Sequence, residues 1–215
     1  MPPPRSPRKS GMAVPTRLSA IERLRNLPPV FRGADLTVRF QWTSKTASHY
    51  LYLWKRRGLV QALGGHSDVY ANCLTGQSPD WEGALKLAMP SAILIGIEAL
   101  RRAGWTTQIP QTPAVAVNPQ KPVFRVDHFQ IERRSSAWFE KAQSGVRDAD
   151  DGLRVLRPAW ALADLLSRES WGACGLWPDD VDPAAISEQD KLDWKTACAA
   201  FGVSTQASDI FLQDA

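Results

Sequence analysis

The stretch from Thr43 to Asn72 constrains the fold of this chain most strongly, because a capped-helix pattern is followed at once by a hairpin pattern. Thr43 or Ser44 suits an N-cap, and Gly58 suits the left-handed position that ends a helix. Between them, apolar side chains recur at the i, i+3, i+4 and i+7 spacing of one helix face, at Ala47, Tyr50, Leu51 and Trp54. We therefore predict a helix over residues 43–57.

Residues 59–72 predict a β-hairpin, because two apolar-rich runs flank Gly64-Gly65-His66-Ser67, whose residues tolerate positive φ angles. Upstream, helical spacing over Leu18–Leu27 ends at Pro28-Pro29. Residues Val30–Gln41 indicate a second short helix, with apolar candidates at Phe31, Leu36, Val38 and Phe40. Helix, helix, turn, helix, hairpin is the order of a winged helix-turn-helix, whose second paired helix enters the major groove of DNA.

Positive charge is concentrated in the same part of the chain. Residues 1–70 hold 12 Lys and Arg against 3 Asp and Glu, a balance of +9, although the whole chain carries only +4. The remaining residues therefore carry a balance of −5. This asymmetry is typical of a nucleic-acid-binding segment joined to a different kind of domain. Three of the charges belong to a basic, proline-rich tail, which leaves the segment at +6 without them.

The face of the 43–57 helix opposite its apolar stripe is polar or cationic. Its first turns would lie closest to base edges, its N-terminus suits phosphate oxygens, and cations near its end would contact the DNA backbone. His66 would lie at the tip of the wing. We therefore predict these DNA-binding residues: Arg39, Thr43, Ser44, Lys45, Ser48, His49, Tyr52, Lys55, Arg56 and His66. Two alternatives are a merely solvated helix and a winged helix that binds protein.

We divide the chain into a disordered basic tail (1–16), a winged helix-turn-helix (17–75) and a partner-binding α+β domain (76–215). In the last, Trp81–Arg102 has a helical pattern with a break at Met89-Pro90. Strand-like runs follow at 114–117, 123–126, 129–132 and 153–156, and helices are expected from Pro158, over 186–201 and over 204–212. Among its tryptophans we expect Trp160 and Trp194 in the core, whereas Trp171 and Trp177 fit core or protein interface equally.

Several other classes of protein do not fit. No run reaches the ~20 apolar residues that span a bilayer, and the N-terminus lacks the apolar segment of a signal peptide. Cys73, Cys174 and Cys198 are odd in number and far apart, which supports neither a disulfide framework nor a metal site. We therefore expect a cytoplasmic protein with no membrane association, no metal and no cofactor.

Enzymatic signatures are weak, and we expect no catalytic residues. Asp179, Asp193 and Lys195 match the letters of a metal-dependent nuclease, but that chemistry needs them on adjacent strands, and residues 187–200 have helical spacing. The histidines lie outside any G-x-S-x-G elbow, and there is no P-loop. Asp127-His128 fits an edge strand better than a metal site.

The order of these motifs resembles that of AbiEi-type antitoxins over roughly residues 17–170. The first matching pieces are Leu53–Val60 with Val69-Tyr70, and Pro90–Leu100 with Gly104-Trp105. The next are Gln108-Ile109-Pro110 with 114–117, then Gly152–Val155 leading into Ala161–Leu166. The chain departs from the family at Trp54, where a smaller aliphatic residue is frequent, and at His66, where an arginine is common.

The resemblance implies an antitoxin that represses its own promoter through the winged helix. It also implies that the C-terminal domain neutralises a nucleotidyltransferase-like toxin encoded in the same operon. Repression would occur by occupancy of promoter DNA, with more than one copy bound at repeated half-sites. The alternative is a winged-helix DNA-binding regulator or accessory protein without a toxin partner.

Overall fold

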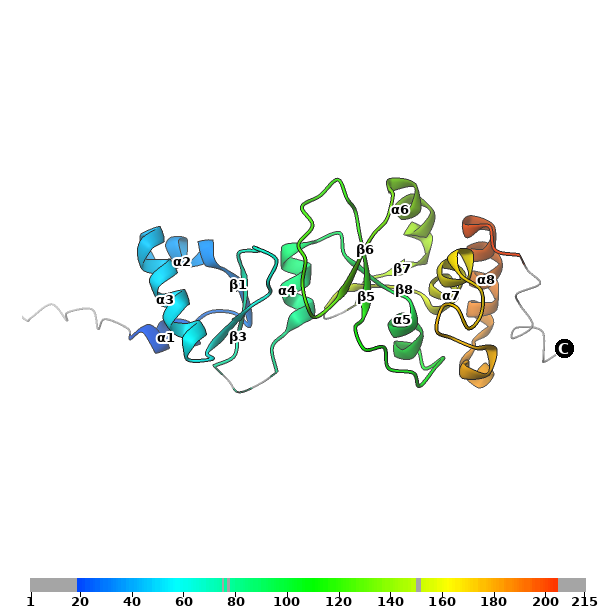
Figure 1. Ribbon diagram of the computed structural model, residues 1–215, viewed down its shortest axis with the longest axis horizontal. Helices are drawn as coiled ribbons and strands as arrows, with labels where there is room; N and C mark the ends of the chain where they lie inside the picture. Colours follow the sequence, from blue (N-terminus) through cyan, green and yellow to red (C-terminus); the bar gives the residue numbers. More distant parts are fainter. Residues whose placement is uncertain (1–18, 75, 77, 150–151, 205–215) are drawn as a thin grey trace, which may run out of the picture.

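The structure is a computed structural model that describes residues 19–74, 76, 78–149 and 152–204. It has a mixed α+β fold with two separate sheets among the described residues, so the α+β part of the predicted fold class is confirmed. Figure 1 shows the three-stranded sheet and the first three helices at one end of the molecule, and the five-stranded sheet with the last helices at the other. Helix α4 (Trp81–Ala88) lies between them.

Residues 19–74, the described section of the first part of the chain, contain three helices and three short strands. In chain order they are α1 (Ala20–Arg25), β1 (Val30–Arg32), α2 (Gly33–Phe40), α3 (Ser44–Arg56), β2 (Val60–Ala62) and β3 (Val69–Asn72). The strands form an antiparallel sheet in the order β1-β3-β2. The helix expected over 43–57 and the hairpin expected over 59–72 are both present.

Helix α3 begins and ends as its sequence predicts. Thr43 is the N-cap, and its side-chain oxygen accepts a hydrogen bond at 3.2 Å from a backbone N–H of the first turn. At the other end Gly58 has φ +67° and its N–H donates to the Lys55 carbonyl. The Leu59 N–H donates to the Trp54 carbonyl. This Schellman arrangement satisfies carbonyls that the last turn would leave unpaired.

Two expectations for the residues before α3 are wrong. Residues 30–32 form strand β1 instead of a first helical turn, because their backbone pairs with β3, and α2 begins only at Gly33. Val38, expected on the apolar face, is 82% exposed, whereas Leu36 is fully buried. Residues two apart point to different sides of a helix, so the two side chains cannot share one face. Ile21 in α1 is also exposed.

One hydrophobic cluster holds this part together, with members from α1 and the turn after it, β1, α2, α3 and β2: Leu24, Leu27, Phe31, Leu36, Ala47, Leu51, Trp54 and Val60. Three residues of the predicted α3 stripe are therefore in the core. The fourth, Tyr50, is half-buried and stacks on Trp42 with ring centroids 4.5 Å apart.

The second part is built on a five-stranded mixed sheet in the order β6-β5-β4-β8-β7. Its strands are β4 (Ile93–Ile95), β5 (Ala114–Val117), β6 (Gln130–Arg133), β7 (Val146–Arg147) and β8 (Arg154–Leu156). After α4, its helices are α5 (Ile97–Arg102), α6 (Ser136–Ala142), α7 (Pro158–Arg168) and α8 (Glu188–Phe201). Short 3-10 turns lie at Gln143–Gly145, Pro178–Asp180 and Pro183–Ala185. The central strand β4 is antiparallel to β5 and parallel to β8.

The sequence predicts some of these elements and misses others. Strand β5 and the proline-initiated helix α7 are confirmed, and the runs at 129–132 and 153–156 become β6 and β8. The single broken helix over Trp81–Arg102 is wrong, because Ile93–Ile95 forms a strand. Residues 123–126 form no strand, and His128 lies in a turn instead of an edge strand. Of the helix expected over 204–212, residues 205–212 lie outside the described residues.

The three residues that match the nuclease motif do not come together in one site. Asp179 lies in a 3-10 turn, whereas Asp193 and Lys195 both lie on α8. Asp193 is buried and forms an ion pair with Arg157, with N and O 2.5 Å apart. Among the residues that the structure describes, no group of three His, Cys, Asp or Glu could hold a metal ion.

Trp160 and Trp194 are buried, as expected. Of the two tryptophans left open, Trp171 is half-buried and Trp177 is 62% exposed. Within the described part of the chain, no helix combines the length and apolar character needed to cross a membrane.

The hairpin of β2 and β3 packs against the second part of the chain. Leu63 and Val69 are 2% and 1% exposed, and they belong to the same hydrophobic cluster as Val126. At the hairpin tip, a Cβ added to Gly65 would be 2.3 Å from the Arg125 carbonyl oxygen, so the two backbones lie in close contact. The hairpin is therefore covered by the second domain on one side.

The three-stranded sheet also contacts the second part of the chain through α4. Strands β1 and β3 pack against α4. The Arg32 guanidinium on β1 donates a hydrogen bond to the Leu87 carbonyl on α4 at 2.6 Å. The two parts of the chain thus share packed surfaces at both the base and the tip of the hairpin.

Candidate nucleic-acid interface

The polar face of α3 is exposed along its whole length, because the opposite face packs into the core through Ala47, Leu51 and Trp54. Seven of the predicted DNA-binding residues lie on it and are exposed: Ser44, Lys45, Ser48, His49, Tyr52, Lys55 and Arg56. Hydroxyl, imidazole and ammonium groups are therefore presented to solvent in one row.

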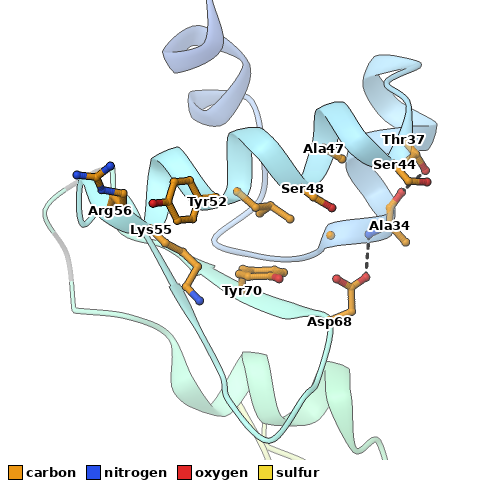
Figure 2. A pocket seen from close by; sticks show the side chains of 12 residues that line it. Ala34, Thr37, Ser44, Ala47, Ser48, Tyr52, Lys55, Arg56, Asp68 and Tyr70 are labelled. Atoms are coloured by element: carbon orange, nitrogen blue, oxygen red, sulfur yellow. Dashed lines mark hydrogen bonds between the residues drawn. The ribbon is translucent and has the colours of Figure 1, made fainter.

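A groove with a volume of about 740 Å³ runs along one side of this row. Figure 2 shows α3 above the groove, with Ser48, Tyr52 and Lys55 on its wall and Tyr70 and Asp68 on the opposite wall. The beginning of α2 closes one end. Lys45 and His49 are not among the residues that line the groove. Helix α3 therefore presents polar groups both to the groove and to open solvent.

A carboxylate occupies the N-terminus of α2. The Ala34 N–H donates to Asp68 Oδ2 at 2.9 Å, and the Gly33 N–H donates to the Asp68 backbone carbonyl at 3.0 Å. Gly33 permits this approach, because a Cβ there would be 2.3 Å from Asp68 Oδ1. A helix N-terminus attracts phosphate, so the protein's own negative charge holds a position that a phosphate could otherwise take.

The tyrosines and cations of the groove provide hydrogen-bond donors. Burial, with a smaller contribution from the Asp68 carboxylate, raises the pKa of the Tyr70 phenol above its usual value. The phenol therefore stays protonated at neutral pH and can donate a hydrogen bond. The Arg56 guanidinium lies 5.8 Å from the centroid of the Tyr52 ring, within cation–π distance. Lys55 extends from the end of α3 toward β3 (Figure 2).

The other predicted residues lie apart from this row. Thr43 Oγ1 is 2.9 Å from Thr46 Oγ1 and serves as the helix cap. Arg39 is exposed in the last turn of α2 and does not line the groove. His66 is exposed at the hairpin tip with φ +63°, next to the contact with Arg125, and it does not line the groove either.

Sequence reasoning missed Asp68 and Tyr70, which form the opposite wall. A usable signal exists for Tyr70: along a strand, successive side chains alternate between faces. Because Val69 is the buried residue, Tyr70 must point to the other side. No comparable local signal indicates that Asp68 caps a helix that begins 35 residues earlier in the chain.

Comparison with known proteins gives the fold. No family model matches this chain, and no curated protein matches it in sequence. Among solved structures, it is similar to the crystal structure of the RV2827C protein from Mycobacterium tuberculosis, with a TM-score of 0.55 and 15% identity. The match covers 90% of this chain and 79% of that chain. The two proteins share a fold, and at this identity the similarity shows nothing more.

Proposed function

We propose that residues 19–74 act as a winged helix-turn-helix that binds double-stranded promoter DNA, with α3 in the major groove. The observation that carries the proposal is the row of seven exposed polar and cationic side chains on α3. Support comes from the order of elements, since α2, α3 and the following hairpin stand in the order that this motif requires.

Charge supports the same conclusion. The balance of +9 in residues 1–70 would supply attraction to phosphates that does not depend on sequence. Lys45 and His49, near the start of α3, would then read base edges, because N-terminal residues of a recognition helix approach the bases most closely. Lys55 and Arg56 would bind the backbone from the end of the helix.

The resemblance to AbiEi-type antitoxins supports a more specific function. We infer a cytoplasmic autorepressor whose second domain neutralises a nucleotidyltransferase-like toxin, and which occupies its own promoter in more than one copy. The neighbouring gene separates this from a regulator without a toxin. If it encodes such a toxin, expression of this chain together with that toxin should restore the growth of the cells that the toxin inhibits. If growth is not restored, the antitoxin function is refuted and only the proposed DNA binding remains.

The test of DNA binding uses the full chain and a duplex from the region upstream of its gene. Lys45→Ala with His49→Ala should weaken binding by about ten- to a hundredfold, because a good base contact contributes roughly 1–3 kcal/mol. Lys195→Ala removes one exposed positive charge from α8 and serves as the control. Unchanged affinity of the double variant in an anisotropy titration would show that α3 does not read DNA.

A further inference from the structure

We propose that copies of this chain bind one another through two surfaces of opposite charge. The first is the acidic face, which we define as the exposed Trp177 with the carboxylates of Asp179, Asp180 and Asp182. The second is the run of cations at the end of α3. The acidic face of one copy contacts the α3 cations of another copy.

Negative charge in the second part of the chain is concentrated around the acidic face. Residues 169–190 contain six Asp and Glu and no Lys or Arg. Because residues 71–215 balance to −5, the rest of them balances to +1. Asp179 and Asp182 are exposed, and Asp180 is half-buried. Among the described residues, none of these three carboxylates forms an ion pair. The chain itself therefore leaves this charge unneutralised.

Trp177 is exposed, yet its position is fixed by its neighbours. The side chain is 62% exposed. The backbone N–H of Trp177 donates to Asp180 Oδ2 at 2.7 Å. The ring lies against Gly172, where an added Cβ would be 2.6 Å from Trp177 Cζ2. A large side chain that is already ordered loses little conformational freedom on binding, and Trp is enriched among the residues that carry binding energy.

An indole beside carboxylates suits a partner that presents lysine or arginine. A cation over the face of an indole is attracted by its π electrons. A guanidinium can also form two parallel hydrogen bonds with one carboxylate. The acidic face offers both kinds of group within residues 177–182. Its partner is therefore a basic segment with exposed side chains.

The end of α3 is such a segment. Lys55, Arg56 and Arg57 are consecutive and exposed. Among the residues that the structure describes, none of them forms an ion pair. Figure 1 shows α3 at one end of the molecule and the segment between α7 and α8, which carries Trp177, at the other. One copy cannot bring its own two surfaces together, so the contact joins different copies.

DNA should compete with this contact, because Lys55 and Arg56 are also proposed to bind the DNA backbone. A duplex from the upstream region should therefore separate associated copies. This displacement rests on the proposed function, whereas the contact between copies does not.

Sedimentation velocity of the full chain measures the contact. At about 0.05 M salt the average sedimentation coefficient should rise between about 5 and about 200 μM protein, and at about 0.5 M salt it should stay constant, because salt screens exposed charges. Trp177→Ala should weaken the association by about tenfold or more, as expected for an anchor residue.

Two charge-reversed variants identify the surfaces. Asp179→Lys with Asp182→Lys should be monomeric, and so should Arg56→Glu with Arg57→Glu. An equal mixture of the two should associate, because the first keeps the α3 cations and the second keeps the acidic face.

The matched control reverses two exposed carboxylates elsewhere in the second part, Glu140→Lys with Asp148→Lys, and should associate as the wild type does. Asp182 also accepts a hydrogen bond from the Ala184 N–H, so Asp179→Lys alone provides a milder variant that should weaken association. Circular dichroism checks that each variant keeps its fold.

Three results would refute the contact. One is a wild-type chain that stays monomeric at low salt. Another is association that Trp177→Ala and both charge reversals leave unchanged. The third is a mixture of the two folded variants that remains monomeric. A monomer that binds a different protein through Trp177 would assign the acidic face to that protein instead. If copies associate as expected but no duplex binds, only the proposed DNA binding is refuted.

Discussion

Replacing Gly65 by alanine tests the contact between the hairpin and the second domain. Gly65 has φ +61°, and a Cβ there would be 2.3 Å from the carbonyl oxygen and 2.7 Å from the amide nitrogen of Arg125. Both are backbone atoms, so no side-chain rotation can relieve the clash. The hairpin tip would have to move away from the second domain, which would disturb the packing of Leu63 and Val69.

The expected loss of unfolding free energy in Gly65→Ala has two contributions. A left-handed backbone costs a non-glycine residue roughly 1–2 kcal/mol. Forcing an extra methyl group into a packed contact typically costs about 1–3 kcal/mol more. Gly58 provides the matched control, because it has φ +67° but nothing within 4 Å of its added Cβ. Gly58→Ala should therefore show the first contribution alone, and Gly65→Ala both.

Urea unfolding of the full chain, followed by tryptophan fluorescence, measures the difference. We expect Gly65→Ala to lower the unfolding free energy by about 1–3 kcal/mol more than Gly58→Ala. Equal losses in the two variants would show that the hairpin tip relaxes freely, and that the two domains do not depend on this contact.

Two further predictions concern charge. Asp68→Asn keeps an oxygen that can cap α2 but removes a negative charge from the groove. DNA affinity should therefore rise by about two- to fivefold at low salt. A titration that shows weaker binding would mean that the carboxylate itself contacts the DNA through a cation or water. Hydrogen bonds from Arg101, then Arg102, hold the pKa of the buried Glu98 carboxyl below its usual 4.5. Because the unfolded chain takes up this proton at higher pH than the folded chain, the stabilisation is complete above pH 4.5 and is lost as pH falls through the folded pKa. Urea midpoints measured from about pH 6 to about pH 3 should therefore fall less steeply for Glu98→Gln than for wild type, and parallel curves would contradict this.

The sequence predicted those structural features that depend only on residues close to one another in the chain. The caps of α3, the start of α7 at Pro158 and the turn at Gly64-Gly65 are each determined within a few residues. The exposed face of α3 follows from the same local periodicity. These are also the features on which the DNA-binding proposal depends.

The features that sequence reasoning missed depend on distant partners. Strand β4 is buried on both faces and so lacks the alternation that identifies a half-exposed strand. Strand β1 has only three residues and takes its conformation from β3, which is distant in the chain. Asp68 reaches the groove only because the hairpin folds back on α2. None of these pairings leaves a pattern in the residues around it.

The domain boundary predicted at residue 75 stays a prediction based on turn residues. The structure places Leu63 and Val69, both before that boundary, in the hydrophobic cluster of the second domain. A fragment that starts at residue 76 would therefore lose two buried side chains from its own core. Tests of the second domain are better made with variants of the full chain.

The packing of the hairpin onto residues 123–126 also has a consequence for synthesis. Ribosomes add about 5–20 residues per second. The strand pair 60–72 is therefore complete about 3–11 s before residues 123–126, which cover it, are translated. For that interval the apolar side of the hairpin is exposed on the nascent chain, although the rest of the small N-terminal core can already form. Slow codons between these two segments would lengthen the exposure, and with it the chance of aggregation.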